Sequence, residues 1–141
     1  IYRPSNPKKY KGDSKNIVYR SLWERKFMNY CDLNENILEW ASEEFWIPYK
    51  DPTTNRVRRY FPDFFIKYKD KGGDIRRSVI EVKPMRETLE PKQTKGKSRK
   101  TMINESITYV RNQAKWKAAR EFCDDRKLEF KIMTEKELGI R

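Results

Sequence analysis

Two segments decide how this chain folds: YFPDFFI, residues 60–66, and VIEVKP, residues 79–84. Each is an apolar run with a carboxylate in its middle, Asp63 in the first and Glu81 in the second. Short apolar runs rich in Val, Ile and Phe predict buried strands. Because a buried carboxylate needs a partner that neutralises it or donates hydrogen bonds to it, both positions are candidates for a functional site.

The alternation of side chains along a strand places Glu81 and Lys83 on one face of the second segment. If the two segments pair, Asp63 meets Glu81 across the ladder. Two carboxylates that close repel each other, and a divalent cation with oxygen ligands, Mg²⁺ or Mn²⁺, would neutralise them. Lys83 would then lie beside a water on that cation, where it could orient the water or stabilise charge developing on a phosphate.

Glu24 fits the same interpretation from an upstream helix. The segment SLWERKFMNYC, from about residue 21, has apolar residues at helical spacing and ends at Asn34 to Asn36. Glu24 precedes Phe27 and Met28 by three and four residues, so it lies on or beside the inward stripe. Taken singly, a strand end explains Asp63 and ordinary ion pairs explain the other three residues. The functional hypothesis depends on the combination.

The rest of the pattern predicts a mixed α/β (α+β) sheet with helices on its faces. The turn segments DPTTN, 51–55, and DKGGD, 70–74, separate three strands that follow one another as an antiparallel meander. A long helix then leads to a fourth strand by a parallel, right-handed crossover. The predicted strands are 38–49, 56–69, 75–83 and 128–134, the long helix is 101–126, and EKEL, 135–138, is a last helical turn. The predicted inward stripe of the long helix is Ile103, Ile107, Val110, Ala114, Ala118 and Phe122.

Composition limits the function classes. The 141 residues suit one domain, and 33 Lys and Arg against 21 Asp and Glu give a net charge of +12, which points to a polyanion such as nucleic acid. The absence of histidine excludes Ser-His-Asp triads and histidine-ligated metals. Cys31 and Cys123 fit no zinc spacing and are expected to be buried thiols. No apolar run is long enough to span a membrane and no signal peptide is visible, while Ile1, without an initiator Met, suggests a trimmed or incomplete start.

Two basic segments are expected to contact phosphates without reading sequence. Residues 1–20 form a predicted N-terminal arm, and residues 86–100 form a predicted mobile loop in the domain 21–141. Arg58 and Arg59, close to the acid-bearing strand, are further candidates, although solubility alone would explain any one of these charges. The predicted DNA-binding residues are Lys8, Lys9, Lys11, Lys15, Arg58, Arg59, Lys92, Lys95, Lys97, Arg99 and Lys100.

Pro62-Asp63 followed by Glu81-Val82-Lys83 resembles the motif of the PD-(D/E)xK nuclease superfamily, and the order αβββαβ resembles its restriction-endonuclease-like core. More narrowly, segments across nearly the whole chain resemble the head-completion nucleases of contractile-tailed phages. Those segments are KYKGDSKNIVYRSLWE, EWASEEFWIPY, RRYFPDFFIKY, IEVKPMRET, MINESITY and KWKAAREFCDDRKLEFKIMTE. The endonuclease subunit of heteromeric transposases is similar through EVKP and the last of these segments; some of those relatives carry Gln where this chain has Glu81.

The resemblance implies a metal-dependent hydrolase of double-stranded DNA with little sequence specificity. It implies Asp63, Glu81 and the backbone carbonyl of Val82 as ligands of Mg²⁺ or Mn²⁺, Lys83 beside the attacking water, and Glu24 as an accessory acid. It further implies action on packaged DNA in head completion, head or head–tail connector proteins as partners, and a place in the virion head or neck or the infected bacterial cytoplasm. A transposase or restriction-type endonuclease subunit and a non-catalytic DNA-binding connector protein are the alternatives.

Overall fold

A computed structural model describes residues 1–139, so the last two residues of the predicted domain lie outside it. The elements of this single domain follow one another as η1 (Pro7–Lys9), α1 (Leu22–Leu33), β1 (Ile37–Ser42), β2 (Ile47–Asp51), β3 (Arg56–Tyr60), β4 (Phe64–Lys69), β5 (Ile75–Val82), α2 (Met85–Thr88), α3 (Arg99–Asp125), β6 (Glu129–Met133) and α4 (Glu135–Leu138). No helix within residues 1–139 is long and apolar enough to cross a bilayer.

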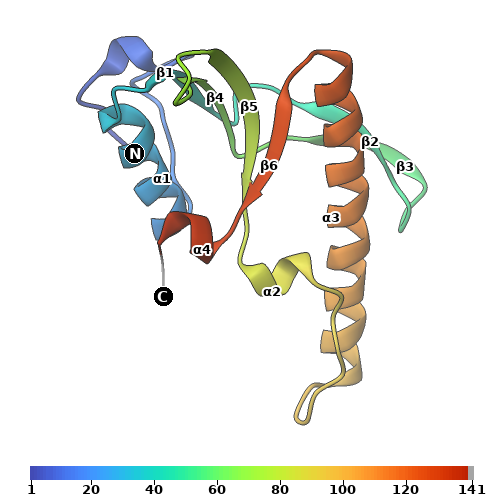
Figure 1. The fold of residues 1–141 in the computed structure, drawn as a ribbon. Coiled ribbons are helices and arrows are strands. Elements are labelled where there is room, and N and C mark those ends of the chain that lie inside the picture. The colour runs from blue at the N-terminus through green and yellow to red at the C-terminus, as the bar shows by residue number, and fades with distance from the viewer. Residues whose placement is uncertain (140–141) are drawn as a thin grey trace.

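The central sheet has the strand order β1-β4-β5-β6. β4 pairs antiparallel with both β1 and β5, and β6 pairs parallel with β5 after the crossover through α3. Helices α1 and α4 cover one face of this sheet, and α3 lies on the other (Figure 1). The arrangement confirms the predicted mixed α+β fold and is consistent with a restriction-endonuclease-like core.

The two long predicted strands are each broken into halves. The segment 38–49 forms β1 and β2, and the segment 56–69 forms β3 and β4. Strands β2 and β3 pair with each other as a separate two-stranded hairpin. One break contains Glu43, whose φ is 51°, a left-handed value that a strand does not adopt. The other contains Pro62, which lacks the N–H that a central strand would donate. The hairpin therefore leaves the sheet just where Asp63 begins the return strand.

Helix α1 confirms the sequence prediction. Ser21 is its N-cap, and the Ser21 hydroxyl accepts a hydrogen bond from the backbone N–H of Glu24 at 3.1 Å. The helix buries Phe27, Met28 and Cys31 against the sheet. Its acidic residue in the first turn is Glu24, where the helix dipole favours a negative charge.

The stripe predicted on the long helix is wrong in its first half, whereas Ala114, Ala118 and Phe122 pack, partly buried, against the hydrophobic core. The buried residues of α3 are Asn112, Trp116, Ala119 and Cys123, whereas Ile103 and Val110 are 50% and 41% exposed. The first half of α3 extends beyond the sheet, so its apolar side chains have no sheet to pack against (Figure 1). The helix also begins two residues earlier than predicted, and α2 interrupts the predicted 86–100 loop.

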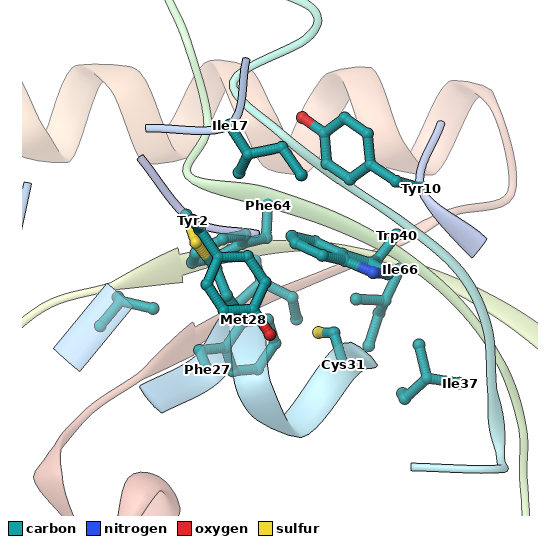
Figure 2. Close-up of a cluster of buried hydrophobic side chains, with 12 residues drawn as sticks. Tyr2, Tyr10, Ile17, Phe27, Met28, Cys31, Ile37, Trp40, Phe64 and Ile66 are labelled. Carbon is teal, nitrogen blue, oxygen red and sulfur yellow. The ribbon is translucent and has the colours of Figure 1, made fainter. Parts of the chain in front are cut away.

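The first twenty residues do not form a free arm. Tyr2, Tyr10 and Ile17 are buried and pack with Met28, Trp40 and Phe64 in the core between α1 and the sheet (Figure 2). Isolated bridges join Tyr2 to Ile17 and Tyr10 to Trp40. The sequence could not predict this packing. Residues 1–20 have the Pro and Gly residues of a loop, and their apolar residues follow no helical or strand periodicity.

Asp32 fastens this segment to α1. Its buried carboxylate accepts hydrogen bonds from the backbone N–H groups of Ser5, at 2.8 Å, and Asn6, at 2.9 Å. The Asn6 side chain donates in return to the Asp32 carbonyl. Both cysteines are free, buried thiols, as the sequence predicted.

We expect Asp32→Ala to lower the free energy of unfolding by about 2–4 kcal/mol, because it leaves two backbone N–H groups without their charged acceptor. Urea unfolding at pH 7 would measure this change. The matched variant Asp125→Ala, at an exposed position in α3, should change the free energy by less than about 0.5 kcal/mol. Equal effects of the two variants would mean that residues 1–20 are not an integral part of the fold.

Candidate active site

Asp63 lies in the break between β3 and β4, and backbone contacts fix it from two sides. Its carbonyl accepts a hydrogen bond from the N–H of Glu43 at 3.2 Å. Its carboxylate oxygen Oδ2 accepts one from the N–H of Val82, at the end of β5, at 2.8 Å. The prediction that Asp63 sits within a strand is corrected: it precedes β4, and its side chain supplies the acceptor for a strand N–H.

Glu81, on β5, is a buried carboxylate, only 4% exposed. Its Oε2 atom accepts hydrogen bonds from the hydroxyl of Tyr60, at the end of β3, and from the indole N–H of Trp116, on α3, at 3.2 Å. Burial and the neighbouring Glu81 charge raise the pKa of Tyr60, so this hydroxyl stays protonated and acts as a donor. Two aromatic donors from different elements thus hold one oxygen of Glu81 in place.

The structure brings Asp63 and Glu81 into contact. Burial, followed by the interaction with the Glu81 carboxylate, raises the pKa of Asp63 to about 8, against the opposing effects of the Val82 N–H and the Lys83 charge. Without a cation, the raised pKa favours a protonated Asp63 carboxyl beside Glu81. Within residues 1–139, no amide, hydroxyl or indole group donates to Oδ1 of Asp63 or Oε1 of Glu81. One oxygen of each carboxylate is thereby left for another ligand.

Lys83 and Glu24 complete the predicted set. The Lys83 charge lowers the pKa of Asp63 and also opposes the raised pKa of Glu24, so it acts on both carboxylates. Burial and then the Asp63 charge raise the pKa of Glu24, whose Oε2 atom accepts a weak hydrogen bond from the Arg20 N–H at 3.4 Å. The four residues predicted from the sequence thus influence one another through their charges.

Four residues of this site escaped the sequence analysis. Tyr60 and Trp116 hold Glu81, while Glu43 and Lys115 add charge. Burial and the charges of Asp63 and Glu24 raise the pKa of Glu43, against Arg20, to which it is ion-paired at 3.1 Å. Burial lowers the pKa of Lys115, and the Glu81 charge opposes this shift. Of these four, Tyr60 gave the clearest signal in the sequence, because it lies only three residues before Asp63.

The donor set fits a hard divalent cation better than any other metal. Carboxylate oxygens without sulfur or imidazole suit Mg²⁺ or Mn²⁺. A divalent cation would also stabilise the ionised form of both carboxyl groups, whose negative charges otherwise repel each other. However, no three His, Cys, Asp or Glu side chains within residues 1–139 are grouped closely enough to enclose an ion. The protein would supply Asp63 and Glu81, and water, phosphate or a backbone carbonyl would supply the rest.

The predicted DNA-binding residues do not form one surface. Lys8, Lys11, Lys15, Arg58, Arg59, Lys92, Lys95, Arg99 and Lys100 are exposed. The 3-10 helix η1 and the loop before α3 lie at opposite ends of the molecule (Figure 1). Lys97 pairs with Glu105 at 2.7 Å, and Arg58 pairs with buried Asp51 at 3.1 Å.

The prediction for Lys9 is corrected. Its ammonium group donates to the carbonyls of Cys31, Asp32 and Asn34 at 2.7–3.0 Å. Those carbonyls lie at the C-terminal end of α1, where the helix dipole favours a cation. Since an ammonium group has three donors, Lys9 has none left for a phosphate.

Comparisons with known proteins identify the family of this chain. Residues 34–135 match the family model described as TnsA-like endonuclease N terminal. The head completion nuclease of Enterobacteria phage T4 is 39% identical over 135 residues, which cover 94% of this chain and 87% of that protein. The first match spans the segment that contains Asp63, Glu81 and Lys83, and the second extends over nearly all of the chain.

The raised pKa of Asp63 predicts how stability depends on pH when EDTA removes divalent cations. The unfolded chain ionises this carboxyl near its usual value, and the folded protein does so only near pH 8. The free energy of unfolding should therefore fall as pH rises between these two values. Asp63→Asn should reduce this slope without abolishing it, because burial also raises the pKa of Glu24 and Glu43.

Urea unfolding at a series of pH values would measure both slopes. The control variant Asp125→Asn, at an exposed position, should show the same slope as the wild-type protein. Identical slopes for the wild type and Asp63→Asn would contradict the buried carboxyl pair.

Proposed function

Since this chain belongs to the TnsA-like endonuclease family, we propose that it is a nuclease that hydrolyses DNA phosphodiester bonds with the help of Mg²⁺ or Mn²⁺. The observation that carries the proposal is the contact of Asp63 with the buried Glu81, with the Lys83 charge acting on Asp63 and on Glu24. A non-catalytic DNA-binding protein would have no use for a buried carboxylate in contact with a second one, because the pair raises its energy. The full set of acids and lysine therefore favours catalysis over the connector alternative.

The chain's own residues have separate tasks in this proposal. Asp63, Glu81 and the carbonyl of Val82 would hold the cation, which would supply charge neutralisation for the phosphate and a lowered pKa for water. Val82 N–H fixes Asp63, and Tyr60 with Trp116 fixes Glu81, so the ligand oxygens are oriented beforehand. Lys83 orients the attacking water and stabilises the negative charge that develops on the phosphate. Glu24 flanks the pair as an accessory acid.

The substrate we propose is double-stranded DNA cut with little sequence preference. The exposed cations of η1, the hairpin and the loop before α3 interact with phosphates, which carry no sequence information. The similarity to a phage protein named head completion nuclease supports a role in which packaged DNA is cut or trimmed before a tail joins the head. We therefore also propose phage head or head–tail connector proteins as partners, in the virion neck or head or in the infected cytoplasm.

Plasmid nicking tests the chemistry. The wild-type protein should convert supercoiled plasmid in Mg²⁺ and leave it intact in EDTA, and Lys83→Ala should cut at least about a hundredfold more slowly. Lys117→Ala, an exposed lysine of α3, is the matched control and should cut within about twofold of the wild-type rate. Equal cutting in EDTA, or no cutting in Mg²⁺, would remove the enzymatic proposal.

Tyr60→Phe tests the orientation of Glu81. Loss of the hydroxyl removes one of the two donors to Oε2, so the Mg²⁺ concentration for half-maximal nicking should rise about tenfold. Tyr30→Phe, at a position 51% exposed, removes a hydroxyl away from Glu81 and should leave this concentration unchanged. An unchanged metal requirement in Tyr60→Phe would mean that this hydrogen bond does not orient a metal ligand.

A further inference from the structure

The β2–β3 hairpin has two chemically different faces. Ile47, Tyr49 and Tyr60 are buried against Trp116 and Ala119 of α3. The alternating residues of the opposite face, together with the two residues that flank the hairpin's base, are exposed. We call this face the outer hairpin face; it consists of Trp46, Pro48, Lys50, Val57, Arg59 and Phe61.

Large apolar side chains are concentrated on this small surface. Trp46, Val57 and Phe61 are 44%, 73% and 45% exposed. Single exposed apolar residues are ordinary, but three on one face of a two-stranded ribbon mark an interaction surface. None of the six residues is acidic, and Lys50 and Arg59 are cations. The charge of the face therefore suits an anionic partner.

The aromatic and cationic groups already lie together. The guanidinium of Arg59 lies 4.7 Å from the centroid of the Trp46 ring, in a cation–π contact. Planar aromatic and guanidinium groups stack on nucleobases, and nearby cations hold the backbone phosphates. Only unpaired bases can offer their faces in this way, because those of a duplex are stacked on their neighbours.

The hairpin is anchored so that this face is held near the candidate active site. Asp51, which is fully buried, pairs with Arg58 of β3 at 3.1 Å and with Arg111 of α3 at 2.9 Å. At the base of the hairpin, Tyr60 bonds to Glu81, and Phe61 is two residues from Asp63. Phe61 and Trp46 flank the Tyr60–Ile47 pair at the end of the hairpin nearest Asp63, so a base stacked on either ring would lie at the edge of the candidate active site.

We propose that the outer hairpin face binds unpaired DNA bases next to the scissile phosphate. This inference rests on the proposed nuclease function and deepens it: the preferred substrates are DNA ends, gaps and locally opened duplexes. The exposed cations bind any phosphate backbone, and the aromatic side chains add affinity only where bases are free. The protein would then act at sites defined by DNA structure and not by sequence.

Binding in EDTA tests the outer hairpin face without cleavage. The probes are a fluorescently labelled oligothymidine and a labelled duplex of the same length, followed by anisotropy. Trp46→Ala combined with Phe61→Ala keeps the net charge and should weaken oligothymidine binding at least about tenfold, since each base–aromatic stack contributes substantially. Duplex binding, which depends on charge, should weaken far less.

The control is Ile103→Ala combined with Val110→Ala, which removes exposed apolar side chains from α3 and should leave oligothymidine binding unchanged. Trp46→Phe combined with Phe61→Tyr keeps two aromatic rings and should restore binding. Circular dichroism of each variant would confirm that it is folded. An unchanged affinity for oligothymidine in the alanine variant, or equal losses for both probes, would overturn the inference and leave the face to another partner, such as a protein.

Nicking of plasmid in Mg²⁺ separates this inference from the proposed function. A protein that cuts plasmid but binds oligothymidine independently of Trp46 and Phe61 would keep the nuclease function and lose the base-binding face. A protein that binds oligothymidine through these rings but cuts no DNA would keep the face and lose the nuclease function.

Discussion

The contact between the carboxyl groups of Asp63 and Glu81 is the constraint on which the rest of the structure depends. A buried acid in contact with a partly buried one is unfavourable unless donors or a cation surround them. The donors come from separate parts of the fold: the Val82 N–H from β5, the Tyr60 hydroxyl from the hairpin and the Trp116 indole from α3. Sheet, hairpin and helix must all be in place before either carboxylate is oriented, so the chemistry and the tertiary fold form together.

The segment from Tyr60 to Asp63 shows how one break in a strand serves several purposes. Tyr60 points inward to Glu81, Phe61 is exposed at the outer hairpin face, Pro62 is buried, and Asp63 supplies an acceptor to β5. A continuous strand would alternate these side chains between two faces of one sheet. The break instead directs them toward different partners, because the hairpin leaves the sheet at this point.

The sequence predicted the chemistry better than the packing. Strand alternation predicted that Asp63 would meet Glu81, although Asp63 precedes β4 and is not within a strand, and helical spacing placed Glu24 in α1. The break at Glu43 depends on a left-handed backbone conformation that no residue type there requires. The first half of the predicted stripe on α3 is exposed because that part of the helix extends beyond the sheet, and only the tertiary structure determines this. The sequence likewise could not show that Lys9 binds three carbonyls at the end of α1, because this contact depends on the tertiary structure.

A net charge of +12 gives this protein affinity for any DNA, and affinity of that kind cannot tell a correct substrate from a harmful one. Selection must come from groups that contact something other than phosphate. Trp46 and Phe61 are exposed aromatic side chains at the end of the hairpin nearest Asp63, where they can contact bases. If stacking on these rings is needed to bring the backbone to Asp63 and Glu81, intact duplex is bound but cut slowly. The same hairpin that orients Glu81 through Tyr60 would then favour hydrolysis of DNA that is already open.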